Sequence, residues 1–189
     1  ECVAKAAQKG NQRCLEPLFA FRPDIAIPLL NHALIHASAA GQLDCVNHLL
    51  SKDVEFDPKA LSCAVMYSAS KGYTEVLEFL LSKRFPVHPD ELNKAIREAS
   101  GKGYVKCLEL LFSSECTIMP GDVIQACFQA VLRQQLPSLE FLFSGKVEIS
   151  DDIFFQVLQA AAQVGFIEPL RFLLNQREVS DERLNEIIL

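Results

Sequence analysis

The chain has 189 residues, half of them hydrophobic, and its 18 basic and 24 acidic side chains give a formal net charge of −6. This balance, without a basic stripe, argues against nucleic acid and anionic membrane surfaces as partners. The apolar runs are far too short to cross a bilayer, and no signal peptide is visible at the N-terminus.

Six segments recur along the chain at a fixed spacing of 31 residues, and a glycine marks five of them. These anchors are Gly10, Gly41, Gly72, Gly103 and Gly165, with Gln134 in the remaining slot. In every segment a leucine stands eight residues after the anchor, an aliphatic residue stands five after it, and a small residue stands four before it. A period of this size indicates a solenoid, a propeller or an array.

Each segment predicts a helix–turn–helix. In the third segment, Asp57 and Pro58 form a helix start, and the apolar spacing that follows is that of one helical face. Gly72 ends this helix where a positive φ is needed, and a second helix is expected from about Thr74 to Lys83. Similar starts recur at His88–Pro89, Met119–Pro120, Ser150 and Ser180.

Residues 37–50 and 69–81 resemble the ankyrin repeat, with a small residue four before the glycine and a Leu-Leu pair eight and nine after it. The triplets at 54–56 and 147–149 also resemble the apolar–acid–apolar triplet that follows the second helix in this family. The resemblance covers the whole chain. It implies an all-α, ankyrin-like helix–turn–helix solenoid whose ordinary role is protein–protein interaction.

The repeats depart from the family in the region of its β-hairpins. They are 31 residues long where ankyrin units run about 33, and the Thr-Pro-Leu-His turn is absent. The glycine expected before the triplet is replaced by Asp53, Arg84, Glu115 and Lys146. We therefore expect a longer first helix and reduced or missing β-hairpins.

We expect residues 1–189 to form a single repeat domain of six repeats with a partial seventh, which opens at residues 184–189. Because the first repeat begins within its first helix, the chain is expected to be a fragment of a longer protein. Neighbouring repeats should bury a common core, since no helix pair can bury its apolar face alone.

Candidate catalytic or metal-binding groups are sparse, and we expect no enzyme activity, metal or cofactor. His32 and His36 share a helical face, but Ala33 stands where a zinc protease needs glutamate. Cys63, one repeat away, is the only nucleophile near these bases, and no acid is evident to orient them. The Gly101–Gly103 segment fits a helix end in the repeat register and not a phosphate-binding loop.

The seven cysteines are an odd number and fall largely at positions suited to small buried residues. Members of one repeat column should lie about 10 Å apart, beyond disulfide reach. We therefore expect reduced cysteines and a cytoplasmic location, or the host cytosol if the protein is a secreted effector.

The expected binding surface is the concave face of the first helices, where residues differ from repeat to repeat. In the third repeat, the outward positions are predicted to be Lys59, Cys63, Tyr67 and Ser70. The predicted partner-binding residues are Met66, Tyr67, Lys94, Arg97, Glu98, Gln125, Phe128, Gln129 and Gln156. Aromatic residues and arginine are typical anchors of interfaces. Packing of Phe128 and Phe155 between repeats is an equally supported alternative.

The expected function is recognition of another protein, with no nucleic acid, membrane or small-molecule substrate. The alternative is that the array recruits substrates for a larger enzyme, such as a host-directed bacterial effector. Sequence flanking residues 1 and 189 would separate the two.

Overall fold

The computed structural model describes residues 2–11, 13, 15, 27–52, 54–114, 116–145, 147 and 149–177. These residues form eleven helices and no strand, so the fold is all-α. The helices are α1 (Cys2–Gln8), α3 (Ile27–Ala39), α4 (Leu43–Leu50), α5 (Pro58–Lys71), α6 (Thr74–Ser82), α7 (Pro89–Gly101), α8 (Val105–Ser113), α9 (Pro120–Leu132), α10 (Leu136–Leu142), α11 (Asp151–Val164) and α12 (Ile167–Gln176). The expected start of a seventh repeat and Ser180 lie outside the described residues.

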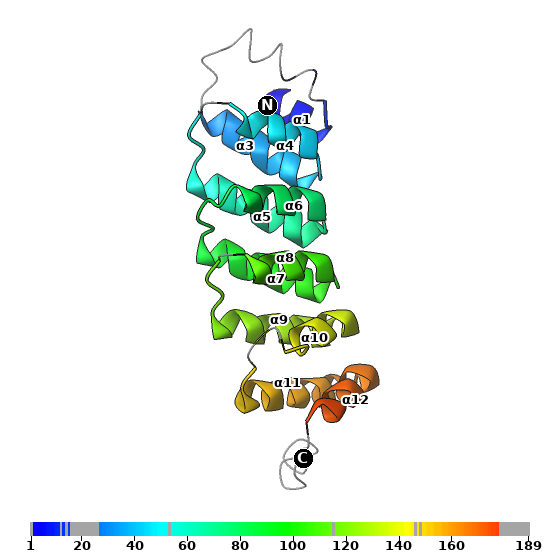
Figure 1. Ribbon diagram of the computed structural model, residues 1–189. Helices are drawn as coiled ribbons and strands as arrows, with labels where there is room; N and C mark the ends of the chain where they lie inside the picture. The colour runs from blue at the N-terminus through cyan, green and yellow to red at the C-terminus, as the bar shows by residue number, and fades with distance from the viewer. Residues whose placement is uncertain are drawn as a thin grey trace.

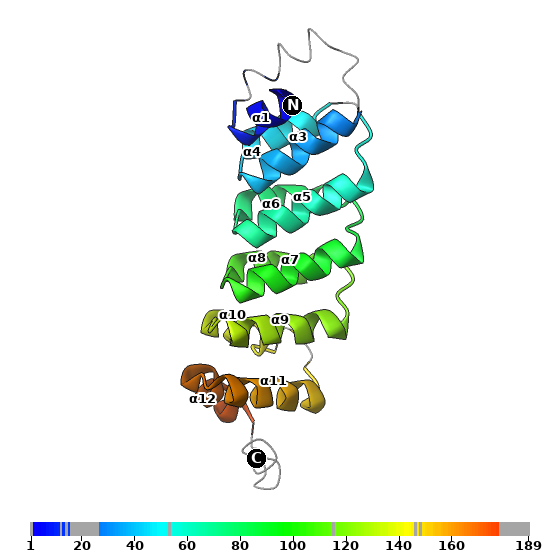
Figure 2. The same ribbon diagram turned by 180° about the vertical axis from the view of Figure 1, so that it is seen from behind.

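The helices stack in two layers, with α1 and α12 at opposite ends of an elongated molecule (Figure 1). Each first helix packs against the first helix of the next repeat, from α1 through α3, α5, α7 and α9 to α11. The second helices α4, α6, α8, α10 and α12 form the other layer, and each also packs against its own first helix. Figure 2 shows the first helices lying side by side along the whole stack. The molecule is therefore an ankyrin-like solenoid.

The repeated apolar positions build one continuous core. The leucines eight residues after the anchors are all fully buried in the described repeats; they are Leu49, Leu80, Leu111, Leu142 and Leu173. The small residues four before the anchors are also fully buried from Ala37 to Ala161, whereas Ala6 in α1 is half-buried. Small side chains let neighbouring first helices approach closely, and the leucines fill the space between layers. Both predictions from the repeat are confirmed for these residues.

The predicted helix starts at Pro58, Pro89, Pro120 and Asp151 are confirmed, and several are capped by side chains. The Asp57 carboxylate accepts a hydrogen bond of 2.9 Å from the backbone N–H of Lys59, and Pro58 occupies the first helical turn. At the start of α9, the Asp122 carboxylate accepts a 2.9 Å hydrogen bond from the N–H of Met119. These contacts satisfy N–H groups that a helix terminus leaves without an intrahelical acceptor.

The turn between paired helices needs a left-handed residue, which explains the glycine anchors. Gly41 has φ +73°, and the ring of Tyr73 from the next repeat lies against its Cα. A Cβ at Gly41 would fall 2.7 Å from the Cδ1 atom of Tyr73. The glycine therefore serves both the backbone conformation and the close approach of the next repeat. Gln134 keeps the same turn with φ +56°, so the repeat continues without its glycine.

The described connections between repeats contain no strand. Side chains of the first helices form hydrogen bonds with their backbone instead. Asn31 Oδ1 in α3 accepts a hydrogen bond of 3.2 Å from the N–H of Asp57, and Ser62 Oγ in α5 accepts one of 3.0 Å from the N–H of His88. Asn93 in α7 donates to the Asp122 carboxylate at the start of α9. Asn31, Ser62 and Asn93 occupy one repeat column, which is apolar at the next position, Ile124. This polar column joins each of these first helices to the start of the next one.

Candidate binding surface

The nine predicted binding residues lie on first helices and are accessible to solvent. Met66 and Tyr67 belong to α5, Gln156 to α11, and the other six to α7 and α9. Lys94, Gln125 and Gln156 are exposed, as is Tyr67 at 38%. The remaining five are Met66, Arg97, Glu98, Phe128 and Gln129, all of which are half-buried. We call the accessible side of α5, α7, α9 and α11 that carries these nine residues the first-helix surface.

The helical period explains why these residues share one side. Ala64, Val65 and Ser68 turn into the core of α5 and are fully buried. Met66 and Tyr67 stand between these core positions in the sequence and therefore lie on other sides of the helix. Tyr67 is exposed, whereas Met66 is partly buried against the edge of the core. The 31-residue repeat then places Arg97 and Glu98 at the matching positions of α7. Regular stacking therefore aligns side chains from four repeats on one surface, although the residue types differ.

One outward position was predicted wrongly. Ser70 is only 6% exposed, and its carbonyl oxygen accepts a 2.8 Å hydrogen bond from Lys102 Nζ of the next repeat. The Lys102 ammonium also lies 3.2 Å from the Glu98 carboxylate. The side chain of Lys102, the residue that follows α7, thus reaches back to the C-terminal end of α5. This pair also fixes the position of Glu98 within the surface.

Phe155 packs partly against the core, and its ring centroid lies 5.5 Å from that of the preceding residue, Phe154, in an edge-to-face arrangement within α11. Its packing between repeats stays a prediction. Phe128 is half-buried in α9, and its place in a partner contact stays a prediction.

The thiol of Cys63 is half-buried on this surface, and its pKa is raised. Burial raises the pKa of Cys63, and the Glu91 carboxylate raises it further, while Lys59 and Lys94 act in the opposite direction. A raised pKa leaves little thiolate for nucleophilic attack. His32 and His36 are both exposed on α3. In the part of the chain that the structure describes, no three His, Cys, Asp or Glu side chains gather as a metal site would require.

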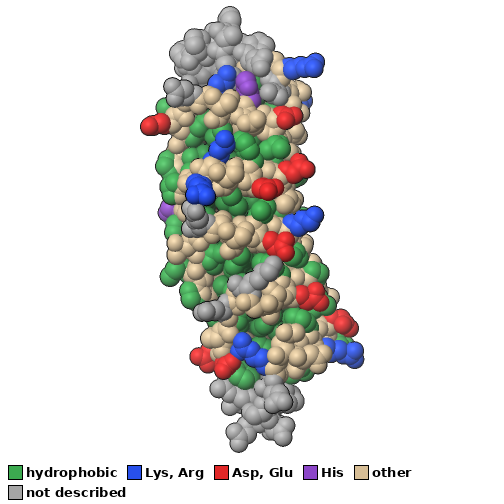
Figure 3. Space-filling model, viewed as in Figure 1, with side chains coloured by type: hydrophobic (Ala, Val, Ile, Leu, Met, Phe, Trp, Pro, Cys, Tyr) green, Lys and Arg blue, Asp and Glu red, His purple; other side chains and the backbone are tan. Residues whose placement is uncertain are grey.

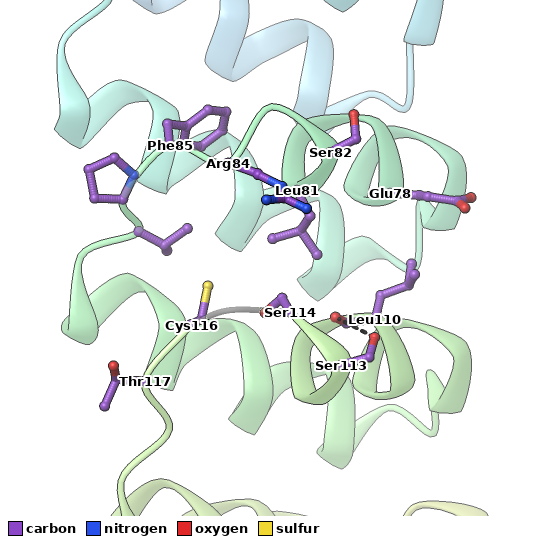
Figure 4. Close-up of a pocket in the computed structure, with 12 residues that line it drawn as sticks. Glu78, Leu81, Ser82, Arg84, Phe85, Leu110, Ser113, Ser114, Cys116 and Thr117 are labelled. Carbon is purple, nitrogen blue, oxygen red and sulfur yellow. Dashed lines mark hydrogen bonds between the residues drawn. The ribbon is translucent and has the colours of Figure 1, made fainter.

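A groove of about 560 Å³ lies between two repeats, where the connection after α6 meets the end of α8 (Figure 4). Leu81, Phe85 and Leu110 give it apolar walls. Its serine hydroxyls are used locally: Ser113 Oγ donates to the Leu110 carbonyl at 3.2 Å, and Ser114 Oγ donates to a carbonyl of the same helix. Neither serine is bonded to a base within the described residues, so the groove lacks the arrangement that activates a nucleophile.

The polar column of Asn31, Ser62 and Asn93 was not predicted from the sequence. Its signal is present there, since three polar residues recur at the repeat spacing. The contact of Tyr73 with Gly41 was not predicted either, because no pattern within one repeat shows which side chain of the next repeat covers its turn.

Residues 34–122 match the family model described as ankyrin repeats (3 copies). Residues 34–122 therefore carry ankyrin repeats, and the match runs from α3 to the start of α9. Ankyrin repeats are generally protein–protein interaction modules and are typically not enzymes. A search of curated proteins finds no match. None of the helices described here is long and apolar enough to cross a membrane.

Proposed function

We propose that this chain is a recognition module that binds a partner protein through the first-helix surface. The observation that carries the proposal is the exposure of Tyr67 beside Met66, Arg97 and Phe128, on helices that stack in register. Tyrosine, arginine and methionine are enriched in protein interfaces. A stacked scaffold holds such side chains in place before binding, which lowers the entropy lost when the partner docks.

The site is tested by affinity capture from a cytosolic lysate with the whole chain as bait, followed by mass spectrometry. Tyr67→Ala and Phe128→Ala are expected to lose the captured partner, because aromatic anchors carry much of the energy of an interface. Tyr73→Ala is the matched control: Tyr73 is 37% exposed, close to the 38% of Tyr67, but lies at the helix turns. Circular dichroism and thermal melting establish that each variant is folded.

Alternatively, Tyr67→Ala and Phe128→Ala retain the partner and Tyr73→Ala loses it. That result would place the binding site at the turns between paired helices and not on the first-helix surface. If the array instead recruits substrates for a larger enzyme, the same surface would hold the substrate. The variants would then slow modification of the substrate without loss of a stable complex.

A reducing, cytoplasmic location is part of the proposal. The six cysteines within the described residues are free, and Cys45, Cys107 and Cys127 are buried in the core. Buried free thiols at repeat positions serve packing. Cell fractionation with an antibody against the chain would test the location.

A further inference from the structure

The last described repeat, α11 with α12, exposes apolar side chains that the earlier repeats cover. The residue two after the anchor is 62% exposed as Ile167, but it is half-buried in the four preceding repeats, as Leu43, Thr74, Val105 and Leu136. The residue nine after the anchor is 39% exposed as Leu174, but it is half-buried as Leu50, Leu81, Phe112 and Phe143. Within the described residues, this is the one repeat without a repeat after it.

Two positions that are closed in the preceding repeats also open in the last one. Ala162 of α11 is half-buried, whereas the equivalent residues are fully buried, namely Ser38, Ala69, Ser100 and Val131. Leu170 of α12 is half-buried, whereas Val46, Leu77, Leu108 and Leu139 are fully buried. We call Ala162, Ile167, Leu170 and Leu174 the end face. Figure 3 shows hydrophobic side chains along the length of the stack, down to its C-terminal end.

The turn of the last repeat is open in the same way. In four earlier repeats a side chain of the following repeat lies against the anchor glycine: Gln42 on Gly10, Tyr73 on Gly41, Tyr104 on Gly72 and Gln135 on Gly103. A Cβ at Gly165 would meet no atom within 4 Å. A repeat that closes a solenoid carries a polar outer face. The end face is apolar, so the last described repeat has the surface of an internal repeat.

Arg177, the residue after α12, shows where the chain leaves this repeat. Its guanidinium donates hydrogen bonds to the Asp151 carboxylate and, at 2.8 Å, to the Ile149 carbonyl oxygen. It also lies 5.1 Å from the centre of the Phe154 ring. These three partners lie at the start of α11. Because each next first helix begins beside the N-terminal part of the preceding one, as the bond from Asn31 to Asp57 shows, the chain leaves where a further first helix would begin.

The sequence after Arg177 continues the repeat columns of a first helix. Asp181 falls in the column of the N-cap residues Asp57, His88, Met119 and Ser150. Ile188 falls in a column that is fully buried in α5, α7, α9 and α11, as Ala64, Ala95, Ala126 and Val157. Leu189 falls in another fully buried column, that of Val65, Ile96, Cys127 and Leu158. Asn185 departs from the pattern, since it stands in the column of Leu92 and Phe154.

We infer that residues 181–189 begin the first helix of a seventh repeat, and that this repeat packs on the end face. The same interface already joins each described repeat to the next, and it would remove the exposed surface of Ile167 and Leu174 from water. The inference rests on this stacking and not on the proposed function. One consequence does rest on that function: the first-helix surface would continue to Ile187, which falls in the exposed column of Lys94, Gln125 and Gln156.

The test is amide hydrogen exchange of the 189-residue chain, read by mass spectrometry in the peptides that cover α11. Ile188→Asp places a charge in a column that packing requires to be apolar or small, so the segment should leave the end face. The α11 amides should then exchange at least about tenfold faster, because protection of a repeat depends on the neighbour that covers it. Exchange in α5, at the centre of the stack, should not change.

Ile187→Asp is the matched control, because it makes the same substitution one residue earlier, in a column that is exposed in α7, α9 and α11. It should leave the exchange of α11 unchanged. Equal α11 exchange in Ile188→Asp, Ile187→Asp and the unchanged chain would overturn the inference. If circular dichroism shows that Ile188→Asp is unfolded, Ile188→Ala and Ile187→Ala give the same comparison.

A second copy of the chain is the competing occupant of the end face, and sedimentation velocity over a range of concentrations detects it. A dimer that Leu174→Asp abolishes, together with α11 exchange that Ile188→Asp leaves unchanged, would show that another molecule covers this face and would refute the inference. Either outcome leaves the proposed function standing, because Tyr67 and Phe128 belong to other repeats.

Discussion

The contact between Gly41 and Tyr73 predicts that an alanine at this turn disturbs two repeats at once. A non-glycine residue at φ +73° destabilises the folded state by about 1–2 kcal/mol through backbone strain. Alanine also lowers the conformational entropy of the unfolded chain, which offsets about 0.4–1 kcal/mol of that loss. The new Cβ would also fall 2.7–3.0 Å from three ring atoms of Tyr73. These include Cγ, close to the tyrosine backbone, so the ring cannot simply swing away. Overpacking of this kind costs about 1–3 kcal/mol.

Gly165→Ala is the natural comparison, because Gly165 has φ +75° and a Cβ there would meet no atom within 4 Å. We expect Gly41→Ala to lower the free energy of unfolding by about 1–3 kcal/mol more than Gly165→Ala does. Urea titration followed by circular dichroism measures both values.

A double-mutant cycle separates the clash from the position of each turn in the array. The additional cost of Gly41→Ala should largely disappear when Tyr73→Ala is already present, since the ring that collides with the new methyl group is gone. Equal costs for Gly41→Ala in the two backgrounds would refute the reasoning. In that case the repeats would be able to move apart at the turn without loss of stability.

Three further predictions concern the turn, the connections and the core. Gln134→Gly should raise the free energy of unfolding by about 0.5–1 kcal/mol, because it removes the backbone strain at φ +56°. Urea titration measures this change. A lower free energy of unfolding would mean that contacts of the Gln134 side chain stabilise the protein by more than the strain costs. Ser62→Ala should cost about 1 kcal/mol, because the partly buried N–H of His88 loses its acceptor, whereas Ser82→Ala, which loses only a bond within its own helix, should be nearly neutral. Burial raises the pKa of Cys127 to about 12. Above about pH 9 the Cys127 thiol therefore ionises in the unfolded chain but not in the folded one. This difference should lower the free energy of unfolding by about 1.4 kcal/mol per pH unit between about pH 9 and pH 12. Cys127→Ala should make the free energy of unfolding fall less steeply with pH, and an equal fall in both proteins would contradict the raised pKa of Cys127.

Much of the fold follows from residues that repeat at one spacing. Leu49, Leu80 and Leu111 were predicted to be buried, and they are, because a period of 3.6 residues within a helix fixes which side chains share a face. Helix ends were equally predictable at Asp57 and Gly72, since capping and positive φ depend on the chemistry of one or two residues. The absence of strands from the described connections was expected as well, because other residues stand where the family has a glycine and a turn motif.

Contacts between repeats were decided only by the tertiary structure. Ser70 was predicted to face outward, yet it is buried, and its carbonyl oxygen accepts a hydrogen bond from Lys102 of the next repeat, 32 residues later. A sequence period states that equivalent residues lie one repeat apart. It does not state how far a flexible side chain reaches across the gap, or which of several polar groups it meets, because that depends on the distance and angle at which the repeats stack.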